Sequence, residues 1–372
     1  MVKVLNIVAA MNQGGAENFC MNVYRNIDRE QFQFDFCMAK KMTGFFEQEI
    51  RQLGGKIFKL DDITKIGIRR FRKQFEKILD ENRYDVVHCH MSAWCWIFLP
   101  VARKKRIGIR IAHSHTSNVT ITTYKGAISN LMALYVRHTI GAYANVLIAC
   151  SKEAADWLYG KKEHVKIVKN GIDTNKFLYD KEKRCRIRAE LGIDSDEVLI
   201  GHVGRFTPPK NHKFLIDIFR KYHINNAKSK LLLVGSGVLQ NKIRRKVEDY
   251  GLNGAVIFAG DLDNVYDYMS AMDLFLLPSL YEGLGIVLIE AQCSGLRCII
   301  SDTVPEEAVI TGQVARCSIY ASPEKWAEMI GKLIIYNRKN CKEQIQKSGY
   351  DIRSTVKVLE EIYILGNKAI ES

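Results

Sequence analysis

The sequence predicts an α/β fold built on doubly wound parallel sheets, and two observations carry this prediction. Short apolar runs rich in β-branched and aromatic residues alternate with helical patterns from one end of the chain to the other. The alternation restarts midway, where a second apolar run leads into a second glycine-containing loop and helix. The runs predicted as strands are 4–9, 32–38, 85–88, 107–112, 145–149, 198–203, 231–234, 256–258, 273–277 and 298–300. Predicted helices include 16–26, 212–222, 239–250 and 323–335, the last with Ser322 as its N-cap and Pro323 as its first residue.

The restart of the pattern predicts two domains. A chain of 372 residues is long for one compact domain. The turn-rich segment 168–173 contains Asn170-Gly171 and predicts a hinge. We therefore expect an N-terminal Rossmann-like domain at 1–168 and a C-terminal one at 169–351. A last helix at about 352–372 is expected to pack back on the first domain.

Composition and cysteine usage favour a protein of the reducing cytoplasm. The chain is 47% hydrophobic and 26% charged, and none of its ten cysteines forms a C-x-x-C pair. The apolar start resembles a signal peptide only loosely, because Asn6 interrupts it and no cleavage site follows. The apolar stretch 93–102 covers about half a bilayer. We expect no secreted or membrane-spanning segment.

A formal charge of +14 requires an anionic partner, such as a nucleic acid, an anionic lipid or a phosphorylated substrate. Basic residues concentrate at 65–77 and 103–106. In 65–77 they alternate with Ile68, Phe71 and Phe75 at helical spacing. This pattern indicates either a solvated helix face or a basic amphipathic helix on the inner, acidic face of the plasma membrane. No recognised DNA or RNA motif is present, so no nucleic acid partner is expected.

Two cations follow the predicted strand 198–203. Arg205 comes directly after Gly204, and Lys210 lies five residues further on. Ligands of α/β proteins bind at the carboxyl edge of the sheet. An arginine fork and a lysine point charge together suit a diphosphate. The alternative is that both are solvated surface charges.

The segment 279–291 combines two carboxylates with a glycine-rich turn. Glu282, Gly283, Leu284 and Gly285 follow a predicted strand, and Glu290 lies in an apolar helix. An unpaired carboxylate in such surroundings is costly, and sugar hydroxyls are suitable partners for it. The N–H groups at the helix start suit phosphate oxygens. Alternatively, Glu282 caps the helix and Glu290 forms a structural ion pair.

Two glycine loops resemble nucleotide-binding loops incompletely. Gly14 and Gly15 follow the first strand and open a helix, and 235–237 reads Gly-Ser-Gly. Neither completes the G-x-G-x-x-G pattern, and no acidic residue lies at a convincing distance. A dinucleotide-dependent oxidoreductase is therefore a weaker hypothesis, and a plain tight turn stays open for the first loop.

Taken together, these motifs resemble the retaining glycosyltransferases of family 4, which have the GT-B fold. Glu282 and Glu290 match the family's E-x7-E motif, and Gly204-Arg205 with Lys210 matches its G-R-x4-K. Further agreement lies in 14–17, 170–173 and 234–237, so the resemblance covers essentially the whole chain. Bacterial capsule and exopolysaccharide enzymes are the most similar group in pattern. Lys169 and Arg297 replace prolines that are frequent in the family.

The resemblance implies two Rossmann-like domains facing across a cleft and a role for each matching residue. Arg205 and Lys210 would hold the donor diphosphate, Glu290 the ribose and Glu282 the donor sugar. Gly14, Gly15, Gly204 and the turn 283–285 would line the donor site. The donor would be a UDP-sugar, with GDP-mannose open, and no metal or other cofactor is expected. The acceptor would be a glycan or a polyprenyl-diphosphate-linked sugar, with 117–125 as a candidate lid. Another GT-B nucleotide-sugar enzyme, an epimerase or a hydrolase, is the alternative.

Two H-x-H pairs end predicted strands of the first half, His88/His90 and His113/His115. Such pairs suit zinc, but no carboxylate cluster accompanies them. In the family, a histidine at this point contacts the donor sugar. His115 fits this role best and His113 is its rival, while a purely structural histidine remains an alternative.

Overall fold

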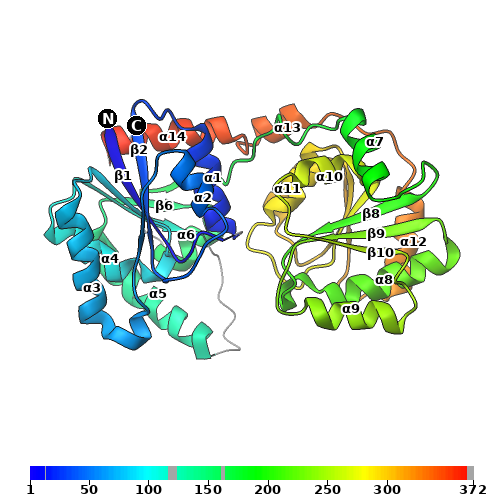
Figure 1. The fold of residues 1–372 in the computed structure, drawn as a ribbon, viewed down its shortest axis with the longest axis horizontal. Coiled ribbons are helices and arrows are strands. Elements are labelled where there is room, and N and C mark those ends of the chain that lie inside the picture. Colours follow the sequence, from blue (N-terminus) through cyan, green and yellow to red (C-terminus); the bar gives the residue numbers. More distant parts are fainter. Residues whose placement is uncertain (13, 116–123, 161–163, 367–372) are drawn as a thin grey trace. The chain divides into compact units, whose positions relative to one another are not determined.

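The computed structural model describes residues 1–12, 14–115, 124–160 and 164–366 (Figure 1). The chain forms two compact units. Unit 1 comprises Met1–Ile172 and Asp351–Ser372, and unit 2 comprises Asp173–Tyr350. Each unit is a parallel sheet covered by helices, as the alternating sequence pattern predicts.

The sheet of unit 1 has seven parallel strands in the order β3-β2-β1-β4-β5-β6-β7. Its strands are β1 (Val2–Val8), β2 (Phe32–Met38), β3 (Ile57–Lys59), β4 (Val86–Cys89), β5 (Ile109–Ser114), β6 (Val146–Ala149) and β7 (Val165–Ile167). Its helices are α1 (Gly15–Asn26), α2 (Glu47–Gln52), α3 (Ile63–Glu81), η1 (Ser92–Trp94), α4 (Cys95–Lys104), α5 (Tyr124–Tyr143), α6 (Lys152–Tyr159) and α14 (Ile352–Leu365). Residues of β1 alternate between two apolar cores: Leu5 and Ile7 pack with α3, α4 and α6, and Val4 and Val8 pack with α1 and α14.

The sheet of unit 2 has six strands in the order β10-β9-β8-β11-β12-β13. Its strands are β8 (Val198–Val203), β9 (Ser229–Val234), β10 (Val256–Gly260), β11 (Leu274–Leu277), β12 (Arg297–Ser301) and β13 (Val314–Cys317). Its helices are α7 (Lys181–Glu190), η2 (Pro208–Lys210), α8 (His212–Asn225), α9 (Gln240–Asp249), α10 (Val265–Ala271), α11 (Ile286–Cys293), η3 (Glu306–Ala308), α12 (Pro323–Leu333) and α13 (Lys342–Lys347). The largest fully buried side chain, Trp326, packs from α12 under this sheet.

Both sheets have the Rossmann-type strand order, and this order fixes where a ligand site forms. In unit 1 the order reverses between β1 and β4, and in unit 2 between β8 and β11. At such a point the loops leaving the two central strands turn in opposite directions and open a crevice at the carboxyl edge. The glycine loop of unit 1 follows β1, and Arg205 of unit 2 follows β8. The candidate residues thus gather at the two switch points.

The last helix of the chain, α14, packs on unit 1 against α1. The Asp351 side chain accepts a hydrogen bond from the Arg353 N–H at the start of the helix. Thr355 Oγ1 then donates to the Lys169 carbonyl at 2.9 Å. The backbone at Gly171 lies close to the start of α14, and a Cβ there would lie 2.5 Å from Thr355 Oγ1. This close contact explains why residue 171 is a glycine.

The basic segment 65–77 lies in α3, and its apolar side points inward. Phe71 and Phe75 are buried in a core of unit 1, whereas Lys65, Arg69 and Lys73 are exposed. The sequence left open a solvated helix face or a basic amphipathic helix on a membrane. The apolar side of α3 packs against the protein, so this side does not contact lipid. The exposed face of α3 is basic, and this face is available to contact an anionic surface. Among the helices within the described ranges, none is long and apolar enough to cross a bilayer.

None of the ten cysteines, all of which lie in the described ranges, is in a disulfide, and nine of them are buried. The exception, Cys185, is exposed on α7. Burial raises the pKa values of the Cys20 and Cys95 thiols well above the usual value for cysteine. The buried thiols therefore pack as small apolar side chains.

Candidate functional site

The carboxyl edge of the unit 2 sheet presents an unpaired cation. Arg205 follows β8 and is exposed. Its guanidinium forms no ion pair or side-chain hydrogen bond with any part of the chain that the structure describes. A solvated guanidinium at the sheet's switch point is free to bind a doubly charged phosphate group.

A second glycine loop supports the backbone around Arg205. Gly235 and Gly237 both have positive φ, and a Cβ on Gly235 would collide with the Gly204 carbonyl oxygen. A Cβ on Gly237 would lie 2.7 Å from the Phe206 carbonyl oxygen. The Phe206 N–H donates to the Ser236 carbonyl at 2.8 Å. The glycines of 235–237 thus allow this loop to pack directly on the loop that carries Arg205.

Lys210 and Glu282 form a largely buried ion pair. Lys210 Nζ lies 2.7 Å from Glu282 Oε1, and the side chains are 19% and 8% exposed. Ser279 Oγ donates to the same carboxylate oxygen at 2.6 Å. The Leu280 N–H donates to the Pro209 carbonyl at 2.7 Å, which joins the two loops. The arrangement fixes one cation and one carboxylate at the ends of adjacent strands.

Ser279 is held in turn from β12. Its carbonyl oxygen accepts hydrogen bonds from Ser301 Oγ and Thr303 Oγ1, each at 2.6 Å. Sequence reasoning missed Ser279 as a site residue, although its position three residues before Glu282 is a signal for a local side-chain contact.

Glu290 lies in α11, and its environment disfavours the ionised form. The residue is partly exposed, and its carboxyl group pairs with none of the residues described. Burial raises the pKa of Glu290 from 4.5 to about 8, and the charge of Lys210 partly opposes this shift. A carboxyl group in this state is well suited to bonding with hydroxyl groups of a ligand.

Replacing Glu290 with glutamine is expected to stabilise the free protein at alkaline pH. Because the folded-state pKa lies above the unfolded-state value, the wild-type protein loses stability as the pH rises from about 4.5 through about 8. Glu290→Gln removes that loss and should raise the melting temperature at about pH 9 by roughly 2–4 °C for each kcal/mol recovered. At about pH 4 the two proteins should melt together, since the wild-type carboxyl is protonated in both states.

The comparison is made by thermal unfolding across this pH range. Glu248→Gln, at an exposed position of α9, serves as the matched control and should change nothing. Coincident melting curves of wild type and Glu290→Gln at every pH would contradict the raised pKa.

The turn before α11 leaves backbone donors available. Gly285 is the N-cap with φ of 81°, and no side chain caps this helix. Gly283 is exposed with open space at its Cβ position, whereas Leu284 is buried. First-turn N–H groups of a helix without a side-chain cap can bind phosphate oxygens.

In unit 1 the glycine loop opens α1. Gly14 is the N-cap of this helix and Gly15 its first residue. The Glu17 side chain folds over Gly14, where a Cβ would collide with its carboxylate. Gly15 is exposed and has no neighbour within 4 Å of its Cβ position. The open side of this loop is therefore at Gly15, and residue 13 lies outside the described part of the chain.

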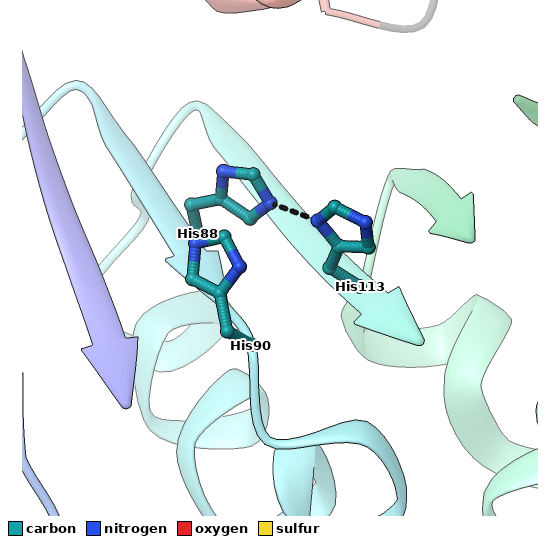
Figure 2. A group of neighbouring side chains, drawn as sticks. All are labelled: His88, His90 and His113. Carbon is teal, nitrogen blue, oxygen red and sulfur yellow. Dashed lines mark hydrogen bonds between the residues drawn. The ribbon is translucent and has the colours of Figure 1, made fainter. Parts of the chain in front are cut away.

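The four histidines of the two H-x-H pairs form one cluster at the carboxyl edge of unit 1. His88 and His113 are fully buried, His90 is 5% exposed, and His115 is partly exposed. Figure 2 shows the rings of His88, His90 and His113 turned toward one another. One ring nitrogen from each of these three lies within 4.8 Å of the others, a spacing compatible with a metal ion.

The donor set fits a metal ion poorly. His88 Nε2 and His113 Nδ1 share a hydrogen bond at 3.0 Å, which a metal would have to replace. The group contains no carboxylate or thiolate to offset the charge of a divalent ion in a buried setting. The arrangement is that of a hydrogen-bonded histidine cluster.

The structure therefore brings some of the predicted residues together and leaves others apart. Lys210 and Glu282 are in contact, and the charge of Lys210 acts on Glu290. Arg205 lies on the same loop as Lys210, five residues before it, and has no ion-pair partner among the described residues. In unit 1, His115 joins a cluster that also includes Asn6, which sequence reasoning did not assign to any site. Most of the predicted lid, 117–125, lies outside the described residues.

Comparison with known proteins gives the same assignment to both halves of the chain. The family "Glycosyltransferase Family 4" matches residues 13–176, and "Glycosyl transferases group 1" matches residues 183–349. EpsF of Bacillus subtilis (strain 168), which carries the name of a glycosyltransferase, is 34% identical over 97% of this chain and 96% of its own. The capsular polysaccharide biosynthesis glycosyltransferase CapH of Staphylococcus aureus is 28% identical over 98% of this chain and 99% of its own.

Among solved structures, Anabaena HepE in complex with UDP and glucose superposes with a TM-score of 0.79. It is 17% identical, with 98% of this chain and 100% of that chain covered. This likeness shows the fold. With both family matches and the EpsF relationship over nearly the full length, the chain belongs to glycosyltransferase family 4 and is a glycosyltransferase with the GT-B fold.

Proposed function

We propose that this glycosyltransferase transfers a hexose or related sugar from a UDP-sugar, with retention of the anomeric configuration, in the synthesis of a surface polysaccharide. The name of CapH, a capsular polysaccharide enzyme, supports the pathway class. The complex of HepE with UDP and glucose supports the nucleotide. The observation that carries the proposal is the charge arrangement in unit 2. The loop after β8 carries Arg205, which is unpaired among the described residues, and Lys210, which forms a largely buried ion pair with Glu282.

In the proposed reaction, the bond between the anomeric carbon and the departing phosphate oxygen breaks. The acceptor hydroxyl oxygen bonds to that carbon from the same face, and its proton passes to the departing phosphate. Negative charge builds up on the diphosphate as the bond breaks. Arg205 and Lys210 stabilise this charge, and the uncapped start of α11 adds backbone donors. We propose that no metal ion takes part.

The remaining residues bind and orient the donor. Glu290 accepts hydrogen bonds from the ribose hydroxyls, which relieves its unpaired state. Glu282, fixed by Lys210 and Ser279, contacts hydroxyls of the transferred sugar. In unit 1, His115 contacts the same sugar and Gly15 offers backbone to the donor. Positioning of this kind accounts for much of the rate enhancement of group transfer. The loops before α1, after β8 and before α11 are also proposed to line the donor site, through Gly14, Gly204, Gly283, Leu284 and Gly285.

A donor screen tests the proposal. The purified protein is incubated with UDP- and GDP-sugars and a mixture of lipid-linked acceptors, and the released nucleoside diphosphate is measured. Release of UDP that depends on the acceptor supports transfer. Release that is independent of any acceptor would indicate a hydrolase instead, and epimerisation without release would indicate an epimerase.

For the acceptor, we propose a polyprenyl-diphosphate-linked sugar held at an anionic membrane surface. Five basic residues are exposed on α3: Lys65, Arg69, Arg70, Lys73 and Lys77. Large apolar side chains are exposed on α5, with Leu131 67%, Leu134 49% and Tyr135 50% accessible. Helix α4 packs against both helices, so the basic and apolar groups belong to one side of the unit 1 sheet (Figure 1). Basic and apolar groups together favour binding to an anionic bilayer.

Reversing the charge of α3 is expected to weaken liposome binding. Arg69→Glu, Arg70→Glu and Lys73→Glu combined should lower the affinity for vesicles with anionic lipid by about 10²-fold, at about 1 kcal/mol per basic residue lost. The matched control reverses Lys242, Arg244 and Arg245 on α9, which are also exposed and basic. Flotation with and without anionic lipid measures the effect. Equal, negligible binding of the wild type to both kinds of vesicle would exclude the membrane partner.

A further inference from the structure

A chain of hydrogen bonds links His115 to the centre of the unit 1 sheet. His115 Nε2 lies 2.9 Å from His90 Nδ1. His90 Nε2 lies 3.2 Å from Asn6 Oδ1. Asn6 is 1% exposed and lies in the middle of β1, where it pairs in register with His88 of β4. A buried amide in an inner strand is costly unless its polar atoms are used. The Asn6 Oδ1 is used in this way, whereas its Nδ2 has no hydrogen-bond partner among the described residues.

Aromatic packing fixes the plane of the rings in this chain. His115 stacks on His113 with ring centroids 3.9 Å apart, and His90 lies 3.9 Å from His88. The Phe19 ring from α1 contacts His115 at 5.3 Å, His113 at 5.1 Å and His90 at 5.9 Å. Phe19 belongs to the helix that begins at the glycine loop. The imidazoles of His90, His113 and His115 therefore each pack against Phe19 and against another histidine ring, which restricts their orientation.

All four imidazoles are in the neutral form near neutral pH. Burial lowers the pKa of His115 to about 3 and places the pKa of His88, His90 and His113 well below the usual value. A neutral imidazole has one N–H donor and one acceptor nitrogen. The hydrogen bonds of each ring therefore determine which nitrogen carries its proton.

The Asn6 oxygen determines the direction of the chain. Because Oδ1 only accepts, His90 Nε2 is the donor to it. His90 Nδ1 is then the acceptor, so His115 Nε2 is the donor to His90. His115 Nδ1 is left with a lone pair. Among the described residues it has no hydrogen-bond partner, and it is shielded from solvent.

We propose that Asn6 and His90 are positioning residues that hold His115 with its proton on Nε2, so that its Nδ1 accepts a hydrogen bond from a hydroxyl group of the donor sugar. The inference rests on the proposed function, in which His115 contacts that sugar. A buried acceptor without a partner costs free energy, and a sugar hydroxyl supplies the missing donor. An acceptor at this point selects a hydroxyl over a group that cannot donate a hydrogen bond.

The neighbouring histidine pair supplies a matched control. Tyr363 of α14 lies with its hydroxyl 2.8 Å from His88 Nδ1, and His88 Nε2 lies 3.0 Å from His113 Nδ1. A tyrosine hydroxyl both donates and accepts, so this pair does not depend on a fixed direction. Tyr363→Phe removes one hydrogen bond at the same depth of the same cluster and leaves the chain from Asn6 to His115 intact.

The direct test is the tautomer of His115, read from nitrogen NMR of protein labelled with ¹⁵N-histidine. His115→Asn and His90→Asn assign the two rings by loss of their signals. The wild-type protein should show both as neutral Nε2–H tautomers at about pH 7. An Nδ1–H tautomer for His115 would overturn the proposal, because the opposite orientation of the Asn6 amide reverses every proton in the chain.

Kinetics then test the role in the reaction. Asn6→Leu removes the acceptor that orders the chain and should lower kcat/KM for the donor by about 10-fold, the effect of one hydrogen bond. Inhibition by free UDP should stay unchanged, because UDP lacks the sugar. Tyr363→Phe should retain the wild-type kcat/KM. Equal kinetics of Asn6→Leu and Tyr363→Phe would overturn the positioning role.

The two measurements separate this inference from the proposed function. If Asn6→Leu does not fold, the wild-type spectrum still determines the tautomer. If the wild type transfers no sugar from any nucleotide donor, the proposed function fails, and the role of His115 fails with it. If transfer occurs and His115 carries its proton on Nδ1, only the inference fails.

Discussion

Arg205→Ala is expected to lower kcat by about 10²-fold or more while leaving the fold intact. The guanidinium is exposed and unpaired among the described residues, so its removal should change stability by less than about 0.5 kcal/mol. Its proposed role is to stabilise charge that appears on the diphosphate only as the bond to the sugar breaks. Loss of one preorganised donor of this kind costs about 10²–10³-fold in turnover. Steady-state kinetics and thermal unfolding of the same preparation measure the two effects.

Two further variants sharpen this experiment. Arg205→Lys keeps the charge and loses the forked donor, so its kcat should fall between those of the wild type and Arg205→Ala. Arg245→Ala removes an exposed arginine from α9 and should behave as the wild type. Near-wild-type turnover of Arg205→Ala would remove the arginine from the site.

Lys210→Met is expected to reduce both stability and transfer. Removal of the lysine leaves the largely buried Glu282 carboxylate with the Ser279 hydroxyl as a hydrogen-bond donor and no cation. Removing one partner of a buried ion pair lowers the free energy of unfolding by about 3–5 kcal/mol. This range is an upper limit for Lys210, because its side chain is 19% exposed. Turnover should also fall by about 10²-fold, since Lys210 is the second cation proposed to stabilise the diphosphate.

The double variant Lys210→Met with Glu282→Gln separates these effects. It leaves no buried charge, so most of the lost stability should return, whereas transfer should not. Chemical denaturation gives the stability difference and donor turnover gives the activity. Recovery of transfer in the double variant would mean that the pair serves stability alone.

The fold was predictable where the strands are long and fully buried. The central strands β2 and β8 have the predicted bounds, and Ser322 caps α12 at the predicted residue. Continuous apolar runs identify such strands, because both of their faces lie under helices. The strands β3, β7 and β13 were not predicted. They are three or four residues long and lie at sheet edges. An edge strand pairs on one side only, so it does not require a long apolar run that would identify it in the sequence.

The candidate site was predictable as a set of positions and not as a set of contacts. Lys210 and Glu282 are 72 residues apart in the chain, and their ion pair follows from the adjacency of β8 and β11. Spacing along the sequence carries no information on that adjacency. Asn6 shows the same limit, since in sequence it interrupts an apolar run and in the structure it accepts the hydrogen bond of His90. For α3, periodicity identified an apolar face and could not tell whether protein or lipid covers it.

We propose that unit 2 binds the nucleotide of a sugar donor, and thermal unfolding in the presence of nucleotides measures this binding. UDP or GDP at about 100 times its dissociation constant should stabilise the protein by about 2.7 kcal/mol and raise its melting temperature. Glu290→Ala should lose most of this shift, because Glu290 is the proposed partner of the ribose hydroxyls. NAD and a single-stranded oligonucleotide should give no shift. A shift with the oligonucleotide or NAD, and none with UDP or GDP, would exclude a sugar-nucleotide site in unit 2.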